Sequence, residues 1–464
     1  MSRTNSAIRF QIALLVLIGV CASSQASAEV IGVTGTSFTL TAKADRIATP
    51  DGGSIYFWGF TSDGGRPQYP APTLIIPAIP AGGSAVSITV VNSLPAQFNQ
   101  RVSLALAGQS NVTATCTTQP CVQGPITMEA ALGGSVTYTF TASRPGTFLY
   151  NSASRPDLQI EMGLAGAMIV RPGTANQAYD DPAPGPSTLA NPVGSQYDHE
   201  YLFFLSEMDS YIHDLVEEQG VQAADDSGRL GDYFPNYWFI NGRNAPDTMA
   251  EAGVGRLPTQ PYSALPRTHP GDKVLMRVVG GGHDMHPFHH HGQHARVIAV
   301  DGSPLTSVTP FDLSHEVFTI QSLPGQTVDA IFRWTGKDIG WDIYGGPGSP
   351  THLSGSCNGS PAHTPPVGGE GLDPITHEFC GDHGKPLPVV LPEALALANG
   401  PFYSGSPFLG QVGLMPPGDG GLNPNAGYTY MWHSHNEKEI TNFDVFPGGM
   451  MTMLMIEPPG TPIP

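Results

Sequence analysis

Histidines gather in two short segments of the sequence, and their spacing indicates a metal site. His289 and His291 lie two residues apart in the first segment, and His433 and His435 do so in the second. Because residues i and i+2 share one face of a β-strand, each pair presents two imidazoles in the same direction. We expect the two strands to meet inside one barrel, so that the four imidazoles converge on a cation.

The donor set favours copper. Imidazole nitrogens without a thiolate suit Cu(II), Zn(II) or Ni(II), and copper has the highest intrinsic affinity among these ions. We therefore predict one or two copper ions, with zinc as the less favoured occupant. Additional ligands, or groups just outside the ligand shell, are expected among His286, His294, Glu437 and Glu439. For each of these four a solvated strand end is an equally good interpretation, and the catalytic residues stay unassigned.

Three nearby features have structural interpretations. Glu207 and Asp209 follow an apolar run and are expected at the surface rather than beside the metal. The methionine-rich segment 450–455 alternates like a strand, which favours packing in the core over a thioether relay for copper. Under the same alternation, His290 should point away from its two neighbours.

The elements that position these residues are short β-strands. Over 29–173, β-branched runs alternate with turn residues in the spacing typical of a sandwich. Residues 174–197 are rich in Pro, Ala, Asn and Gly and are expected to form a linker. A second set of β runs follows over 198–460, interrupted by a Gly- and Pro-dense excursion over about 335–427. We therefore predict an all-β chain with two domains.

Residues 1–28 are typical of a cleaved export signal. They carry Arg3 and Arg9, an apolar run over 12–20, and Ala26-Ser27-Ala28 before Glu29. No later segment has the roughly 20 apolar residues that a membrane-spanning helix needs, so we expect no membrane span. The predicted location is the periplasm or the cell exterior.

The cysteines agree with an oxidising compartment. Local pairing beyond the signal predicts the disulfides Cys116–Cys121 and Cys357–Cys380, the second of which would staple the excursion. The alternative, a four-cysteine zinc site, lacks paired CxxC spacing. A formal net charge of −19 with no basic tract argues against nucleic acid as a partner.

The sequence resembles the multicopper oxidases, which are built from cupredoxin domains. Their last domain carries a His-Pro-x-His-x-His-Gly motif, which stands here at 286–292, and a His-Cys-His motif, which is matched by His433-Ser434-His435. Gly448-Gly449-Met450 resembles the Gly-Met that follows in the family, and residues 146–150 with 163–170 resemble the closing strands of its first domain. The resemblance covers nearly the whole mature chain and implies two cupredoxin-like Greek-key domains.

The departures from the family pattern imply a changed copper content. Ser434 stands in place of the type 1 copper cysteine, and Glu439 stands where a second type 1 histidine is expected, which implies that no blue site forms. The histidine pairs of the first domain are replaced by Ala105-Leu106-Ala107-Gly108 and Asn151-Ser152-Ala153. What the resemblance carries over is half of a trinuclear cluster: His289, His291, His433 and His435.

Two function hypotheses follow. The first is an exported oxidoreductase with a non-blue copper site in the second domain, to which a small-molecule reductant or a redox protein delivers electrons directly. The second is a non-catalytic copper-binding or structural protein. Zinc-dependent hydrolysis is a third and weaker hypothesis, because no acidic general base can be identified. Relatives with two domains build their clusters between subunits, so the resemblance also allows a homo-oligomer.

Overall fold

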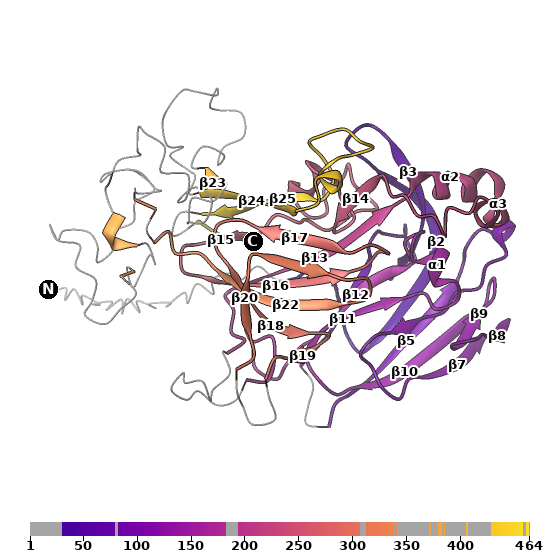
Figure 1. The fold of residues 1–464 in the computed structure, drawn as a ribbon. Helices are drawn as coiled ribbons and strands as arrows, with labels where there is room; N and C mark the ends of the chain where they lie inside the picture. Colours follow the sequence, from indigo (N-terminus) through magenta and orange to yellow (C-terminus); the bar gives the residue numbers. More distant parts are fainter. Residues whose placement is uncertain are drawn as a thin grey trace, which may run out of the picture.

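The chain is described here from a computed structural model (Figure 1). The structure describes residues 30–78, 82–181, 194–306, 312–337, 339–340, 371–372, 379–382, 385, 405–406, 428–457 and 461–463. The expected signal over 1–28 lies outside these residues, as do Cys357, most of the excursion over 335–427, and residues 182–193 of the expected linker. Within the described part, strands dominate and the helices are short.

The first domain is a sandwich of two five-stranded sheets. Sheet 1 has the order β1 (Val33–Thr34), β4 (Ala71–Ile76), β12 (Ala165–Val170), β11 (Gly146–Asn151) and β6 (Ala105–Leu106). Sheet 2 has the order β3 (Ser54–Thr61), β2 (Ser37–Ala48), β5 (Ser84–Asn92), β10 (Ser135–Ala142) and β7 (Thr113–Thr118). A hairpin of β8 (Cys121–Gln123) and β9 (Met128–Ala130), together with η1 (Ala96–Phe98) and α1 (Pro156–Gln159), completes this domain.

The second domain pairs two larger sheets. Sheet 3 has the order β14 (Tyr237–Ile240), β13 (His199–Met208), β16 (Lys273–Gly280), β22 (Thr327–Arg333), β18 (Ala295–Val300) and β19 (Ser303–Pro304), and β20 (His315–Val317) also pairs with β18. Sheet 4 has the order β15 (Arg267–Thr268), β25 (Met451–Ile456), β24 (Tyr428–Ser434), β17 (His286–His290) and β21 (Thr319–Ser322), and β23 (Gly405–Ser406) also pairs with β24. The helical segments of the described chain beyond β13 are α2 (Ser210–Gln219), α3 (Val221–Asp226), η2 (Asp247–Met249), η3 (Cys380–Asp382) and η4 (Glu437–Ile440).

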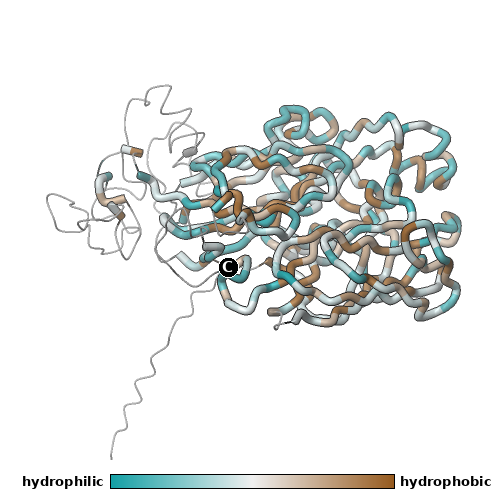
Figure 2. The backbone as a smooth tube through the Cα atoms, turned by 60° about the horizontal axis from the view of Figure 1, so that its bottom comes forward, coloured by the Kyte–Doolittle hydropathy of each residue, from teal (hydrophilic) through white to brown (hydrophobic). Residues whose placement is uncertain are grey.

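Alternation along the strands explains why these residues form sandwiches. In β5 the side chains of Val86, Ile88 and Val90 are buried, whereas those between them are half-buried. Figure 2 shows hydrophilic and hydrophobic positions interspersed along the chain. This period of two lets one face of a sheet enter a core while the other remains polar. The structure confirms the expected all-β fold with two cupredoxin-like domains.

The four sheets stack in one sequence of layers. The core of the first domain lies between sheets 2 and 1 and includes Ile88 and Phe148, and a smaller apolar cluster that includes Leu149 and Phe204 lies between sheets 1 and 3. The core of the second domain lies between sheets 3 and 4 and includes Met276 and Leu454 among its members. Among the sheets of the described chain, sheet 4 is therefore an outermost one, separated from the first domain by sheet 3 (Figure 1).

Buried polar contacts fix the two domains against each other. Thr147 of β11 donates a hydrogen bond to Asp329 of β22 over 2.7 Å, and Arg277 of β16 donates to Thr147 over 2.9 Å. The Arg277 guanidinium also pairs with Glu200 at 2.9 Å, and both side chains are fully buried. Because each buried charge has a partner, the interface avoids the large cost of an unpaired buried ion.

The structure also bears on the expected disulfides and on membrane spans. Cys116 and Cys121 form a disulfide with a Cα–Cα distance of 5.9 Å, as expected. Cys380 is also disulfide-bonded, and its expected partner Cys357 lies outside the described residues. Among the helices in the described ranges, none is long and apolar enough to cross a membrane.

The prediction for the methionine-rich segment is wrong for most of its methionines. Residues 451–456 form strand β25 as expected, but Thr452, Leu454 and Ile456 take the core positions. Met450 is fully buried, whereas the methionines at 451, 453 and 455 are half-buried on the opposite face. The strand alternation is present as expected, but Met451, Met453 and Met455 lie on the side that faces away from the core of the second domain.

Candidate metal centre

The two histidine segments lie on adjacent antiparallel strands. In the ladder between β17 and β24, His289 is paired with His433, and Phe288 is paired with Ser434. Paired residues in an antiparallel ladder have Cα atoms roughly 4.5 to 5.5 Å apart and side chains on the same face. His291 follows directly after β17, and its backbone N–H donates to the carbonyl of Met431 over 3.3 Å. The strand register therefore brings the segments together.

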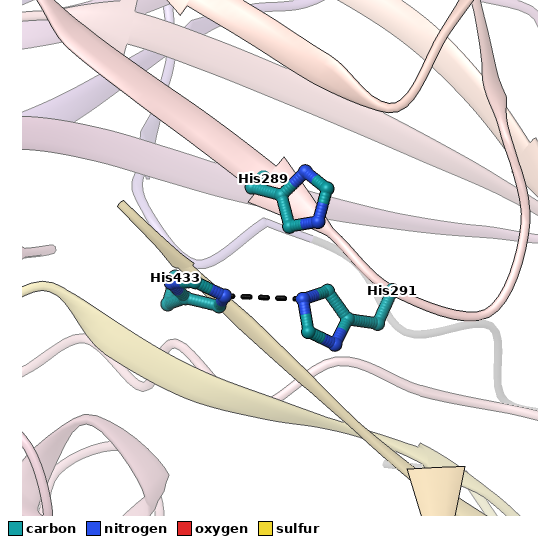
Figure 3. Close-up of side chains that lie close together, drawn as sticks. All are labelled: His289, His291 and His433. Carbon is teal, nitrogen blue, oxygen red and sulfur yellow. Dashed lines mark hydrogen bonds between the residues drawn. The ribbon is translucent and has the colours of Figure 1, made fainter. Parts of the chain in front are cut away.

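Three imidazoles converge at this point (Figure 3). The Nε2 atoms of His291 and His433 are 3.1 Å apart, and one potential ligand atom from each of His289, His291 and His433 lies within 4.8 Å of the others. The ring centroid of His289 is 4.6 Å from that of His291 and 5.5 Å from that of His433. All three side chains are buried.

His435 lies beside this group without joining its three convergent nitrogens. Its ring centroid is 4.8 Å from that of His289 and 5.9 Å from that of His433. His435 is exposed, because the chain turns into η4 directly after it. Of the four histidines expected as ligands, the structure thus gathers three closely and places the fourth at their edge.

Burial keeps the clustered imidazoles neutral. Removal from water, followed by the neighbouring imidazoles, lowers the pKa of His289 to about 4 and that of His291 to about 3. The pKa of His433 is lowered as well, again mainly by burial. A neutral imidazole has a free lone pair on one nitrogen, which is the form that binds a metal.

Neighbouring oxygen atoms orient two of the rings. His433 Nδ1 lies 2.7 Å from the carbonyl oxygen of Ser434, so Nδ1 carries the proton and Nε2 faces His291 with its lone pair. His289 Nδ1 lies 2.8 Å from the hydroxyl of Thr319 on β21. Such outer contacts fix the tautomer and direction of metal-binding imidazoles. Thr319 was not anticipated, because only the register of β21 against β17 reveals that it faces His289.

The donor set fits a copper ion. A metal bound to imidazole lies roughly 2 Å from each nitrogen, so two ligand nitrogens are separated by roughly 3 to 4 Å. The 3.1 Å separation of the His291 and His433 nitrogens meets this requirement. The three described donors are neutral nitrogens, which suits Cu(II) and also Zn(II).

The expectation that the histidines meet inside the barrel is wrong. Their face is the outer face of sheet 4, because the alternate residues Phe288 and Trp432 fill the core of the second domain. His290 points away from His289 and His291, as expected, and therefore faces the core, where its ring packs edge-to-face against Trp432 at 6.0 Å. The apolar residues between the histidines therefore decide which face the imidazoles occupy.

A second polar group lies on the inner face of sheet 4. His286 is fully buried between two carboxylates, with Nε2 2.7 Å from Glu207 and Nδ1 2.9 Å from Glu439. Ser434 donates to the same Glu439 oxygen over 2.6 Å. Burial opposes the charge of His286, but hydrogen bonds and attraction from both carboxylates raise its pKa to about 10. Burial likewise disfavours the charge of Glu207, yet His286 holds the pKa of that carboxyl below its ordinary value.

The remaining predicted residues fall outside the group of three imidazoles. His286 and Glu439 lie on the opposite face of the sheet, and both ring nitrogens of His286 are engaged by carboxylates. His294 is exposed and contacts Phe318 edge-to-face at 5.2 Å, and Glu437 is exposed in η4. None of these four side chains therefore contacts the ligand nitrogens of the three clustered imidazoles.

The surface role expected for Glu207 and Asp209 is wrong, because both side chains are buried. Asp209 caps α2 by accepting from the N–H of Tyr211 and pairs with Arg229 at 2.6 Å. Glu207 contacts His286, as described above. The signal that could have revealed Glu207 is its place at the end of an apolar strand, where a buried carboxylate requires a cationic partner.

Another group of His and Asp side chains lies near the start of β13. Asp272 accepts from His199 Nε2 and His269 Nδ1, each at 3.0 Å, and His269 Nε2 lies 2.9 Å from the carbonyl oxygen of Thr461. Burial disfavours the charge of His269, but these acceptors raise its pKa. The group is thus a hydrogen-bonded ion cluster in which His269 has no free lone pair for a metal.

Comparison with known proteins relates part of the first domain to a known family. Residues 64–175 match a family model described as multicopper oxidase (Cu-oxidase_3), so this part of the chain is similar to a multicopper oxidase domain. Among solved structures, a multicopper oxidase named mgLAC is 17% identical with a TM-score of 0.49, covering 92% of this chain and 87% of its own. A blue copper oxidase from Nitrosomonas europaea is 18% identical with a TM-score of 0.49, covering 90% and 85%. No curated protein matches the sequence.

Proposed function

We propose that the protein is a copper-dependent oxidoreductase that holds one non-blue copper ion with His289, His291 and His433. The observation that carries this proposal is the convergence of three buried imidazoles whose ligand nitrogens lie within 4.8 Å of one another. The match of residues 64–175 to a multicopper oxidase family model supports copper rather than zinc as the ion.

The residues of the chain prepare the site before the ion binds. Copper supplies one-electron chemistry when it is bound. His289, His291 and His433 offer neutral nitrogens at neutral pH because burial lowers each pKa. The Ser434 carbonyl and the Thr319 hydroxyl hold two of the rings in the binding orientation. Because the ligands are already ordered, metal binding loses little conformational entropy, which favours tight binding.

The contacts on the inner face of sheet 4 argue against a blue, type 1 copper site. The Ser434 hydroxyl is bound to Glu439, and both nitrogens of His286 are bound to carboxylates. The side chains at these positions therefore offer neither a thiolate nor a free imidazole lone pair. Electrons would then have to enter at the imidazole cluster itself, from a small-molecule reductant or a redox protein that reaches the outer face of sheet 4.

A copper-binding protein without turnover is the second candidate. It is favoured by His435, whose ring centroid lies 4.8 Å from that of His289. A fourth imidazole bound to the ion would fill the coordination position that a substrate or oxygen needs. The two candidates differ in whether His435 is a ligand.

Metal content and spectroscopy of the purified protein test the proposal. We expect about one copper per chain, an EPR signal of nitrogen-ligated Cu(II), and no intense thiolate-to-copper band in the visible spectrum. His291→Ala and His433→Ala should each lose the copper, whereas the exposed control His294→Ala should retain it. Full copper retention by both cluster variants would refute the site. Copper binding with no oxygen uptake in the presence of a reductant would refute the enzyme and support the binding protein.

We also propose that the chain is exported after cleavage before Glu29. The disulfide between Cys116 and Cys121 supports an oxidising compartment. Intact-mass measurement of the protein from periplasm and culture medium should give a chain that begins at Glu29. A full-length chain found in the cytoplasm would contradict export.

A further inference from the structure

Four methionines share the outer face of sheet 4 with the imidazole cluster. They are the half-buried residues Met431, Met451, Met453 and Met455, which we call the thioether face. In the ladder between β24 and β25, Met431 is paired with Met453, and Thr429 is paired with Met455. Directly opposite side chains have Cβ atoms roughly 4.5 to 5.5 Å apart, and diagonal neighbours roughly 7 to 8 Å. The thioethers of Met431 and Met453 are therefore neighbours.

The thioether face is continuous with the imidazole cluster. His433 is paired with His289 on one side and with Met451 on the other, so the three residues form one row across strands β17, β24 and β25. The next row along β24 contains Met431, whose carbonyl accepts from the N–H of His291. A cation that leaves Met451 thus has the His433 imidazole as its immediate neighbour.

The core of the second domain, as far as the described residues form it, does not include these methionines. The core of the second domain is filled from the other side of β25 by Leu454 and Ile456. The outer face of an antiparallel sheet commonly carries polar residues. Here four of its positions carry flexible, polarizable side chains instead. Neutral thioethers are soft ligands that favour Cu(I) over divalent ions.

We propose that the thioether face binds Cu(I) and transfers it to the imidazole cluster. The transfer is a ligand exchange in which Met451 and Met453 give up the ion and His433 and His291 take it, so no electron or proton is required. The proposal rests on the proposed function for the identity of the receiving site, but uptake by the methionines can be measured separately.

Silver is a suitable probe because Ag(I) is soft, univalent and redox-inert. The full mature protein, labelled with 13C at the methionine methyl groups, would be titrated with Ag(I) and followed by NMR. The methyl signals of the thioether face should shift first, assigned by single Met→Leu variants. A double variant, M451L with M453L, should bind Ag(I) and Cu(I) at least tenfold more weakly in competition with a chromogenic chelator. The control Met128→Leu, a half-buried methionine of the first domain, should bind like the wild type.

The results separate the thioether face from the imidazole site. If the proposal is correct, the double variant still binds Cu(II) at the histidines by EPR but acquires copper from a Cu(I) donor at least tenfold more slowly. The double variant His291→Ala with His433→Ala should lose Cu(II) and keep the Ag(I) shifts. Ag(I) binding by the methionines can therefore be measured even if the proposed copper site proves wrong. Unchanged Ag(I) affinity in the methionine double variant, or Ag(I) shifts confined to other methionines, would overturn the inference.

Discussion

The buried ion cluster around His286 predicts a specific loss of stability at high pH. Its pKa is raised from an ordinary 6.5 to about 10 in the folded chain. Between these values the folded protein retains a proton that the unfolded chain has released, so the free energy of unfolding falls as pH rises through this window. Below pH 6.5 both states are protonated, and the stabilisation is fully present.

The size of the effect follows from the shift. One pKa unit corresponds to about 1.4 kcal/mol, so holding the proton from pH 7 to pH 10 corresponds to a ceiling of roughly 4 kcal/mol. Typical domains have only about 5 to 15 kcal/mol of stability, so the loss should be readily measurable.

Urea unfolding of the metal-free protein at a series of pH values measures it. The reference is a double variant, Glu207→Gln with His286→Gln, which removes the imidazolium and one of its carboxylate partners. Other groups that titrate between pH 7 and pH 10 are common to both proteins, so the difference between their unfolding free energies isolates His286. We expect that difference to shrink by several kcal/mol as pH rises. Parallel curves over this window would refute a cationic His286.

The remaining predictions concern the metal centre and the core. Thr319→Val should weaken copper binding about tenfold by removing the oxygen beside His289 Nδ1, as measured by chelator competition, and an unchanged affinity would show that this contact does not orient the ring. Because the pKa values of His289 and His291 are about 4 and 3, copper affinity should be nearly flat from pH 6 to pH 8, and a steep rise across that range in isothermal titrations would contradict neutral imidazoles. Leu454→Ala should cost about 2 to 5 kcal/mol in urea unfolding, because it empties a fully buried position between sheets 3 and 4, whereas Met455→Ala on the outer face should cost less.

The strands and the histidine pairing were predictable from local patterns. Alternation in segments such as 87–91 and 451–456 requires only a period of two, and the His-x-His spacing requires only that both segments be strands. These features depend on neighbours in sequence, so they can be inferred without knowledge of the fold.

Properties that depend on distant partners were missed. Glu207 was expected at the surface because its place at the end of an apolar strand does not identify His286, 79 residues away, as the cationic partner that a buried carboxylate requires. The face of the sheet that the imidazoles occupy was also predicted wrongly. It depends on which side chains are buried in the core: Phe288 and Trp432, or the histidines that alternate with them along the two strands. Transfer from water to the core is more favourable for the aromatic side chains than for the imidazoles, so the aromatic side chains occupy the core.

The order of the four layers limits which side chains of the same molecule can reach the proposed metal ligands. Packed sheets are about 10 Å apart, so the strands of sheet 1 lie roughly 20 Å behind sheet 4, with sheet 3 and an apolar layer on each side of it between them. No side chain on those strands is long enough to bridge that distance. Replacing Ala105 or Ala107 with histidine would therefore not rebuild a larger cluster within a single copy.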